Sequence, residues 1–372
     1  MKIGFEAKRV YHNTTGLGNY SRDLVRGLAK FYPQNQYYLY NPKPRKEILF
    51  STDDQSITQK LPSSKFFKKF KNYWRQKGIV NDLILDNISV FHGLSGELPA
   101  GLRKNKIKSV VTIHDLIFVR YPKLYSFFDR KIHFIKFKKA VQQADIVIAI
   151  SEQTKRDIID FLHVDENKIR VIYQSCHNAF KQEYSNDLKE LVKSTYKLPE
   201  SFVLNVGTLE ERKNAFHIVK AIKDIDTTLV LIGRETSYSD QIRSYIKANN
   251  IENKVLFLKN IPLEDLVIIY QLATVFVYPS IFEGFGIPII EALYSKTPVI
   301  TTNSGVFPEA GGPYSIYVDP GNIEEIKNQI QYLLESESLQ LKLAENGYEY
   351  VQKFSEENQA KQVMEIYKAL VK

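Results

Sequence analysis

Short apolar runs rich in β-branched residues alternate with helical stretches along most of this 372-residue chain. "KIGFEA" at residues 2–7 is typical of a strand, and "YSRDLVRGLAKFY" at 20–32 is typical of a helix. Further strand-like runs occur at 88–93, 109–115, 145–151 and 168–173. Alternation of this kind predicts an α/β fold with parallel sheets.

The same pattern starts again at residue 202. "FVLNVG" (202–207) and "TLVLIG" (228–233) are strand-like and end in glycine, and "KVLFL", "TVFVYP" and "TPVITT" continue the series. Between the halves, residues 176–201 are charged and lack a strand pattern, which predicts a linker with some helix. The last stretch, from about Ser355, predicts one helix. Because the chain is too long for one ordinary core, the doubling predicts two domains.

Composition narrows the classes of protein that the chain can belong to. Hydrophobic residues make up 44% and charged residues 25%, as in a soluble globular protein. The one cysteine, Cys176, excludes an internal disulfide and suits a reducing compartment. The first 13 residues have no signal-peptide pattern, and Gln271 and Pro279 interrupt the longest uncharged stretch, 266–282, which predicts a buried helix followed by a strand. The net charge of +9 favours an anionic partner: a nucleotide, a nucleic acid or a membrane surface.

In open α/β sheets, ligands bind beyond the carboxyl ends of the strands. "GTLEERKN" (207–214) follows the first strand of the second half and places Arg212 and Lys213 at the expected start of a helix. Two cations beside free backbone N–H groups form a phosphate site. The alternative is that both are solvated charges at a helix start.

"EGFGIPIIE" (283–291) follows a later strand of the same half. Gly284 and Gly286 let the backbone approach a ligand closely, and a proline is tolerated in a first helical turn. If the whole span were helical, Glu283 and Glu291 would lie about 12 Å apart along the helix axis, which matches a nucleotide-diphosphate-sugar from ribose to sugar. The alternative is that Glu283 caps the helix and Glu291 is a surface charge.

These motifs resemble those of the retaining glycosyltransferases of family 4, which have the GT-B fold. The second half matches in family order through "GTLEERKN", "EGFGIPIIE", "TTNSGVFPEAGG" and "YVDPGNIEEI"; the first half matches through "TGLGNYSRDL", "VVTIHDL" and "ADIVIAIS". The resemblance implies two Rossmann-like domains that face a cleft. It assigns 1–180 to acceptor binding, 181–354 to nucleotide-sugar binding, and 355–372 to a helix that packs back on the N-terminal domain.

The resemblance also implies the reaction: a hexose moves from a nucleotide-diphosphate sugar, GDP- or UDP-linked, to a glycan or lipid-linked acceptor in surface polysaccharide synthesis, with retention of configuration. No cofactor and no metal are expected, and "DID" (224–226) is interpreted as a solvated turn. The implied catalytic residues are His114, Glu283, Lys213 and Arg212. The implied donor-binding residues are Gly16, Gly18, Arg212, Lys213, Gly284, Phe285, Gly286, Ile287 and Glu291.

Within this set, Glu291 is expected to bind the ribose hydroxyls and Glu283 the sugar hydroxyls. Many family members carry a second diphosphate-binding arginine where this chain has Thr208, so helix dipoles are an alternative to Arg212 at the diphosphate. For His114 a structural role is the alternative. His92 and Asp115 are expected on the acceptor side, and Glu309 is expected to stabilise its loop or contact the donor.

The segment "KFFKKFKNYWRQKG" (65–78) contains no acidic residue. On a helix, Phe66, Phe70 and Trp74 share one face with Phe67 and Tyr73, and Lys68 and Lys69 share the other with Lys65, Lys71 and Arg75. This predicts an amphipathic helix at an anionic membrane, and hence a cytoplasmic protein bound at the inner face of the cell membrane. The alternative packs the aromatic residues on the domain's own core.

Two other functions fit parts of the sequence. A nucleotide-sugar 2-epimerase shares the fold and the diphosphate site, but lacks the family 4 motifs. A non-catalytic protein that binds nucleic acid or membrane would use the basic aromatic segment for stacking; the intact Glu283, Lys213 and Glu291 argue against it, and no nucleic-acid partner is expected. "GTLEERKN" favours a GDP-mannose-like donor and leaves UDP-sugars open.

Overall fold

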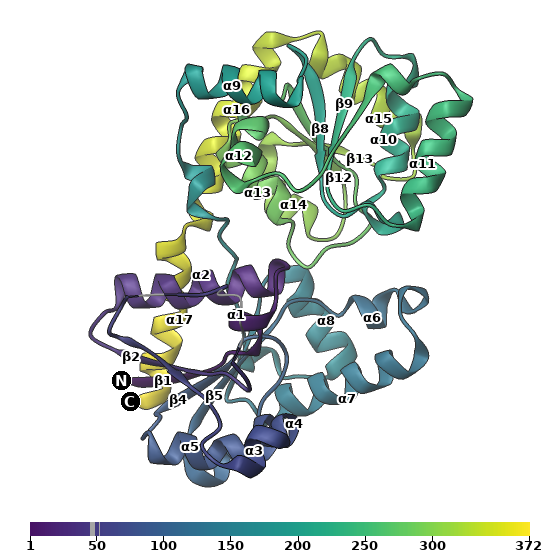
Figure 1. Ribbon diagram of the computed structural model, residues 1–372. Helices are drawn as coiled ribbons and strands as arrows, with labels where there is room; N and C mark the ends of the chain where they lie inside the picture. The colour runs from purple at the N-terminus through teal and green to yellow at the C-terminus, as the bar shows by residue number, and fades with distance from the viewer. Residues whose placement is uncertain (45–48, 52) are drawn as a thin grey trace. The chain divides into compact units, whose positions relative to one another are not determined.

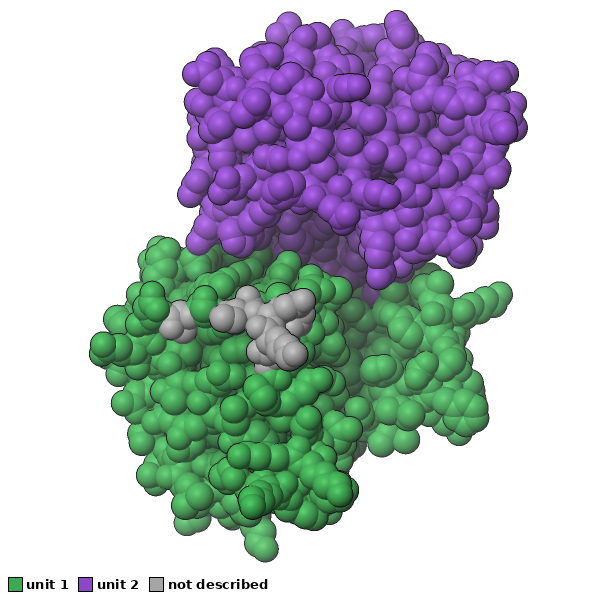
Figure 2. Space-filling model, in the orientation of Figure 1, with its two compact units in different colours: residues 1–175, 355–372 green, residues 176–354 purple. Residues whose placement is uncertain are grey.

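The computed structural model describes residues 1–44, 49–51 and 53–372. They form two compact units, each with its own core (Figure 2). Unit 1 contains residues 1–175 and 355–372, and unit 2 contains residues 176–354.

Unit 1 is built on a seven-stranded parallel sheet with strand order β3-β2-β1-β4-β5-β6-β7. Its strands are β1 Lys2–Glu6, β2 Gln36–Tyr40, β3 Ile57–Lys60, β4 Val90–Gly93, β5 Lys108–Ile113, β6 Ile146–Ala149 and β7 Ile169–Val171. Alternate residues enter different cores: Val90 and Val110 pack on one face of the sheet, and Phe91 and Val111 pack on the other. This two-residue period explains why these runs form strands that are buried on both faces.

Helices cover both faces of that sheet (Figure 1). They are α1 Lys8–His12, α2 Gly16–Phe31, α3 Lys65–Lys69, α4 Lys71–Tyr73, α5 Ile79–Leu85, α6 Ile117–Arg120, α7 Phe127–Gln143, α8 Glu152–Leu162 and α17 Glu356–Val371.

The C-terminal helix α17 belongs to unit 1, as predicted. Ser355 caps its N-terminus by accepting a hydrogen bond from the backbone N–H of Asn358. The helix packs along α2, and Val363, Met364 and Tyr367 enter the same core as Leu24 and Leu28 of α2 (Figure 1). The end of the chain therefore completes the core of the first unit.

Unit 2 is built on a six-stranded parallel sheet with strand order β10-β9-β8-β11-β12-β13. Its strands are β8 Phe202–Val206, β9 Thr228–Ile232, β10 Val255–Leu258, β11 Val275–Tyr278, β12 Val299–Thr302 and β13 Ile316–Val318. Its helices are α9 Asn186–Tyr196, α10 Ala215–Ala221, α11 Ser237–Ala248, α12 Leu263–Leu272, α13 Ile287–Tyr294, α14 Phe307–Gly311, α15 Ile323–Leu334 and α16 Glu337–Val351.

The strand order of unit 2 fixes where a ligand can bind. From β8 the sheet grows toward β9 and β10 on one side, and toward β11, β12 and β13 on the other. The order therefore reverses between β8 and β11, and a crevice forms at their carboxyl ends. The motif "GTLEERKN" follows β8, and the motif "EGFGIPIIE" follows β11. The predicted α/β fold class with two Rossmann-like domains is confirmed.

The segment 65–78 is not the single helix that its periodicity predicts. Phe70 has φ −102° and ψ 60°, which separates α3 from α4, and a π-helical turn follows at Trp74–Gly78. Trp74 is fully buried against Tyr40, Ile79 and Leu83, and its indole N–H donates to Asp82. The assignment of Trp74 to membrane contact is therefore wrong, because its ring fills the core of unit 1 itself.

Across residues 1–44, 49–51 and 53–372, every helix is too short or too polar to cross a bilayer.

Candidate active site

Two glycines shape the backbone where β8 and β9 end. Gly207 has φ +151° and Gly233 has φ +159°, and a Cβ built on Gly233 would lie 1.8 Å from the carbonyl oxygen of Gly207. Only glycine allows this approach. A Cβ on Gly207 would lie 3.0 Å from Cδ of Lys213, so the Lys213 side chain runs directly over this strand end.

Lys213 and Arg212 converge on one carboxylate. Oε1 of Glu283 lies 2.7 Å from Nη1 of Arg212 and 3.0 Å from Nζ of Lys213. Tyr278, the last residue of β11, and Ser280 both donate hydroxyl hydrogen bonds to the same oxygen, at 2.8 and 3.1 Å. The side chains of Arg212, Lys213 and Glu283 are 19%, 16% and 16% exposed, so the cluster is largely shielded but open to a ligand.

These partners keep Glu283 ionised. Burial by itself would raise the pKa of Glu283, but Lys213 and Arg212 outweigh burial and hold it below its usual value. Lys213 also donates to the hydroxyl of Tyr278 at 2.6 Å, and Arg212 bonds Glu210 and the carbonyl of Phe282. With Glu210 included, the two cations face two carboxylates, so the charges of the cluster balance.

The second carboxylate of the motif, Glu291, lies in a different environment. Its Oε2 accepts a hydrogen bond of 3.1 Å from the hydroxyl of Tyr270 on α12. Burial raises the pKa of Glu291 to about 7, against the lowering effects of the Tyr270 hydrogen bond and of Lys213. Two carboxylates eight residues apart therefore differ in charge near neutral pH. Groups with divergent pKa values are typical of functional sites.

The loop between the two carboxylates is only partly helical. Helix α13 begins at Ile287, and Glu283 lies in the preceding loop, so the condition for a separation of 12 Å along a helix axis does not hold. Gly286 is the N-cap of α13, with φ +113°, and it has no side chain to cap the first N–H groups. Phe285 is buried against Phe354, which leaves only its backbone to contact a donor, while Ile287 and Gly284 are half-buried.

In unit 1, His114 follows strand β5 and is almost fully buried. Its Nε2 donates to the carbonyl of Leu94 at 2.9 Å, and its Nδ1 accepts from the amide of Gln174 at 3.3 Å. The ring packs edge-on against Tyr20. Burial lowers the pKa of His114 to about 4, so the ring is neutral at physiological pH. Both ring nitrogens are therefore engaged within unit 1, which agrees with the structural role given above as the alternative.

Gly16 and Gly18, the donor-binding glycines expected in unit 1, lie in the first turn of α2. The amide N–H of Gly18 donates to the side chain of Asn13 and to the carbonyl of Thr15, and a Cβ on Gly18 would lie 2.0 Å from the carbonyl oxygen of Asn13. Gly16 is exposed, and a Cβ there would meet nothing within 4 Å. Close packing explains Gly18 without a ligand, whereas the surroundings of Gly16 leave room for one.

His92 is a correction to the predicted acceptor side. It is 0% exposed, and its ring nitrogens lie 2.5 Å from the hydroxyl of Tyr367 and 2.8 Å from that of Thr112. Because a fully enclosed ring cannot contact an acceptor, His92 has a structural role in docking α17. Asp115 is half-buried, and its carboxylate accepts from the backbone N–H of Ile117.

Sequence reasoning missed Tyr270 and Tyr278, which hold the two glutamates. Tyr278 ends a strand and could have been identified as a strand-end residue, but Tyr270 lies in a helix with no such signal. It also missed an ion-pair network in unit 1: Arg75 lies 2.8 Å from both Glu6, at the end of β1, and Glu97. Arg75 was expected on the cationic face of an amphipathic helix, and this network instead draws it inside.

The arrangement in unit 2 suits an anionic ligand with hydroxyl groups. The cations and the uncapped N-terminus of α13 favour phosphate oxygens, and the carboxylates accept hydrogen bonds from hydroxyls. Asp224 of "DID" pairs with Lys327, and in the described part of the chain no three metal-ligating side chains come together. Glu309 is half-buried in α14, and its contact with a donor remains a prediction.

Comparison with protein families gives two matches that together span most of the chain. Residues 188–350 match the family described as glycosyl transferases group 1, and residues 14–175 match the one described as glycosyltransferase family 4. Among curated proteins, the chain is 23% identical over 393 residues to O-antigen chain mannosyltransferase B of Escherichia coli, with all of both chains covered.

Solved structures share the fold. A sucrose-phosphate synthase from Thermosynechococcus elongatus superposes with a TM-score of 0.81 at 23% identity, covering 100% of this chain and 99% of the other. HepE from Anabaena, solved in complex with UDP, gives a TM-score of 0.79 at 17% identity, covering 99% and 100%. These matches agree with the motifs and the two parallel sheets, and the chain therefore belongs to glycosyltransferase family 4, with the GT-B fold.

Proposed function

We propose that the protein is a retaining hexosyltransferase that uses a nucleotide-diphosphate sugar and builds a bacterial surface polysaccharide. The observation that carries the proposal is the convergence of Arg212 and Lys213 on Glu283 where β8 and β11 end. Preorganised cations at this crevice suit a leaving diphosphate. No metal is needed in this proposal, because the cations and N–H groups neutralise the charge.

The difficult step is departure of the nucleoside diphosphate from the anomeric carbon. Negative charge grows on the β-phosphate as that bond breaks, and fixed donors in a shielded site stabilise it most. Lys213 is the stronger candidate, since Arg212 is also held by Glu210 and the carbonyl of Phe282. Arg212 then contributes charge and fixes the loop.

The two glutamates would bind opposite ends of the donor. Glu291 accepts from the ribose hydroxyls when it is ionised, with Tyr270 orienting the carboxylate. Glu283 accepts from hydroxyls of the transferred sugar. In the structure, the amide of Gln174 donates a hydrogen bond to Nδ1 of His114. The proposed contact of His114 with the sugar requires a sugar hydroxyl to replace this amide and to donate to Nδ1 in its place.

We propose mannose as the transferred hexose and GDP-mannose as the donor. Support comes from the curated relative, which is a mannosyltransferase acting on an O-antigen chain, and from "GTLEERKN". The UDP complex of HepE makes a UDP-sugar the competing donor. The acceptor would be a growing glycan or a lipid-linked sugar.

A lipid-linked acceptor places the enzyme at the cytoplasmic face of the membrane, and a surface of unit 1 supports this. Phe127, Phe128, Ile132 and Ile135 of α7, here termed the α7 patch, are all more than half exposed. Their spacing puts them along one side of the helix, which Lys131, Lys138 and Lys139 share. Exposed apolar residues rimmed by cations suit an anionic bilayer surface.

Phe66 and Phe70 stay in this proposal as a second contact, because both rings are exposed beside Lys68 and Lys69.

Nucleotide binding tests the proposed donor site directly. Thermal unfolding is followed with GDP, UDP, ADP and dTDP on the wild type and on Glu291→Ala. At about a hundred times its dissociation constant, the correct nucleotide stabilises the folded protein by about 2.7 kcal/mol. We expect GDP to raise the melting temperature of the wild type only. A shift with UDP alone would reassign the donor, and no shift with any nucleotide would contradict the proposal.

A further inference from the structure

A chain of polar side chains runs through the hydrophobic core of unit 1, where β4 and β5 pack against α2 and α17. Thr112 on β5 is 0% exposed, and its hydroxyl oxygen lies 3.2 Å from the hydroxyl of Tyr20 on α2 and 2.8 Å from Nε2 of His92 on β4. Nδ1 of His92 lies 2.5 Å from the hydroxyl of Tyr367 on α17. These four side chains, here termed the Thr112 network, connect two helices with two neighbouring strands.

The direction of the hydrogen bonds at His92 follows from burial. Tyr367 is 0% exposed, and His92 is the one hydrogen-bond partner of its hydroxyl among the described residues, so this hydroxyl donates to Nδ1 of His92. Burial lowers the pKa of His92 to about 3, so the ring is neutral and carries a single N–H. This N–H is therefore on Nε2 and donates to Thr112. The contact with α17 thereby sets the tautomer of His92.

The Thr112 network ends at the ring of His114. Tyr20 contacts both Thr112 and His114: its hydroxyl bonds the first, and its ring packs at right angles to the ring of the second. The ring centres of Tyr20 and His114 are 4.6 Å apart and the interplanar angle is 89°, a favourable geometry for aromatic pairs. Because Tyr20 is held at its hydroxyl and along its ring, it keeps one orientation beside His114.

Tyr20 also connects two elements that carry predicted donor-side residues. It lies one helical turn after Gly16 in α2, and His114 directly follows the end of β5. The contacts of Tyr20 with Thr112 and His114 therefore fix the start of α2 relative to the end of β5.

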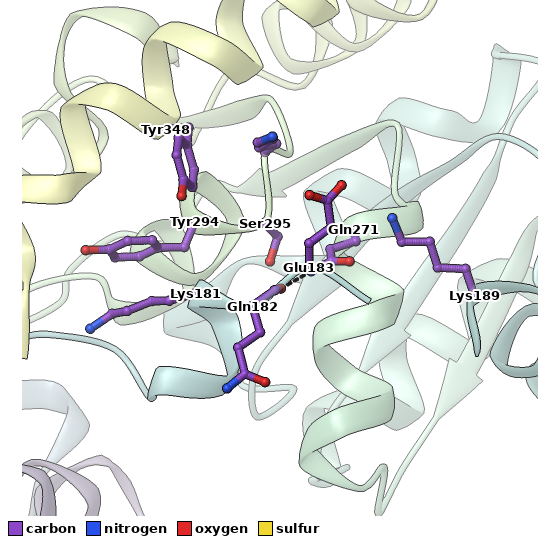
Figure 3. A pocket seen from close by; sticks show the side chains of 9 residues that line it. Lys181, Gln182, Glu183, Lys189, Gln271, Tyr294, Ser295 and Tyr348 are labelled. Atoms are coloured by element: carbon purple, nitrogen blue, oxygen red, sulfur yellow. Dashed lines mark hydrogen bonds between the residues drawn. The ribbon is translucent and has the colours of Figure 1, made fainter. Parts of the chain in front are cut away.

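Buried polar groups in unit 2 do not form a comparable network. A polar cavity of about 340 Å³ lies at the C-terminal end of α13, where the dashed line in Figure 3 joins the amide of Gln271 to the carbonyl of Gln182 at 2.7 Å. The hydroxyls of Tyr294 and Ser295 in its wall are buried and have no hydrogen-bond partner among the described residues. A buried polar network is rigid when its members are satisfied, and the Thr112 network meets this condition.

We propose that Thr112 and Tyr20 are positioning residues for His114, and that α17 supports them through Tyr367 and His92. The proposal rests on the proposed function, because it takes His114 to contact the donor sugar. A site keeps its productive geometry only when the residues around it are themselves fixed by packing and hydrogen bonds. The nucleotide is expected to bind in unit 2, so the Thr112 network should affect kcat and leave nucleotide affinity unchanged.

Two substitutions of Thr112 test the proposal. Thr112→Val keeps the shape of the side chain and removes its hydroxyl, and Thr112→Ser keeps the hydroxyl. Sugar transfer to a membrane-lipid fraction is measured with the radiolabelled donor whose nucleotide raises the melting temperature. In Thr112→Val, kcat should fall about 10–100-fold, as expected for a misplaced reacting group, while KM for the donor is unchanged. Thr112→Ser should restore most of kcat.

Tyr37→Phe is the matched control for loss of stability. Tyr37 on β2 is fully buried in the same core, and its hydroxyl donates to the backbone carbonyls of Leu28 and Tyr32 at 2.7 and 2.8 Å. The variant should lose stability and keep kcat at a temperature where it is folded. An equal fall of kcat in Tyr37→Phe and Thr112→Val would overturn the proposal. Tyr20→Phe removes the bond to Thr112 from its other end and replaces Thr112→Val if that variant does not fold.

Nuclear magnetic resonance of the histidine rings separates this proposal from the proposed function. With isotopically labelled histidine, both His92 and His114 should show N–H on Nε2, and His92→Gln and His114→Gln assign the signals. Thr112→Val should shift the ring signals of His114, and Tyr37→Phe should not. Since this measurement needs no substrate, an inactive wild type contradicts the proposed function alone. Unchanged His114 signals in Thr112→Val would overturn the positioning role.

Discussion

The hydroxyl of Tyr270 donates a 3.1 Å hydrogen bond to Oε2 of Glu291, a carboxyl whose pKa burial raises to about 7. This bond favours the ionised form of Glu291 and works against burial. Tyr270 lies on α12 and Glu291 on α13, so the packing of two helices sets the charge of the residue proposed to bind ribose.

Replacing Tyr270 by Phe should weaken nucleotide binding about tenfold at pH 7, because a hydrogen bond to a charged group contributes about 1.5–3 kcal/mol and the pKa of Glu291 rises further without it. Titration calorimetry of GDP and UDP measures the change. The difference should shrink at pH 9, where Glu291 is ionised in both proteins. An equal loss at both pH values would contradict the role in tuning the pKa.

The free energy of unfolding of the unliganded protein should depend on pH through the titration of Glu291. With a folded-state pKa near 7 and an ordinary value of 4.5, the folded protein binds the proton more tightly than the unfolded chain between these values. Protonation of Glu291 therefore adds its whole contribution to the free energy of unfolding below pH 4.5. This contribution is lost as the pH rises through 7. We therefore compare the free energy of unfolding of Glu291→Gln with that of the wild type by urea unfolding. The variant's free energy minus the wild-type value should be larger at pH 8 than at pH 5. No change in this difference with pH would contradict the raised pKa.

Lys213→Ala should lower the rate of sugar transfer by about 10²–10³-fold, the usual effect of removing one preorganised donor to developing charge. Radiolabelled donor and a membrane-lipid acceptor fraction provide the assay. Lys259→Ala, which removes an exposed lysine just after β10, is the matched control and should keep full activity. Equal rates for both variants would exclude Lys213 from charge stabilisation.

The contact between Tyr367 and His92 should anchor the C-terminal helix. Tyr367→Phe leaves a ring nitrogen of buried His92 without its 2.5 Å partner, which should cost about 1–3 kcal/mol of unfolding free energy. Chemical denaturation measures this cost. Tyr332→Phe, at an exposed ring on α15, serves as the control and should change stability by less than about 0.5 kcal/mol.

Membrane association should depend on the α7 patch. The triple variant Phe128→Ser, Ile132→Ser, Ile135→Ser should lose co-flotation with anionic vesicles at low salt and keep its melting temperature, since these side chains are 76%, 52% and 63% exposed. Phe66→Ser, Phe70→Ser tests the second contact in the same assay. Undiminished flotation of the triple variant would move the membrane contact away from α7.

Much of the fold could be predicted, because strand and helix periods are local properties of the sequence. The ten predicted strands all occur, and so does the helix from Ser355. Three others, β2, β3 and β13, were not predicted. β3 and β13 are short edge strands, and β2, "QYYLY", has no clear apolar alternation. An edge strand is defined by its hydrogen bonds to a neighbouring strand, and a short stretch of sequence does not contain that neighbour.

By itself, the sequence determined the family motifs and the proposed site: the position of Lys213 after β8, and a glycine loop between Glu283 and the helix that carries Glu291. The environment of each side chain was decided by the tertiary structure. The helical period placed Trp74 on an exposed aromatic face. In the structure the helix is interrupted at Phe70, and the side chain of Trp74 is buried in the core. His92 is enclosed because a residue 275 positions away packs on it. Burial and pKa depend on contacts between distant segments, and only the folded chain brings those segments together.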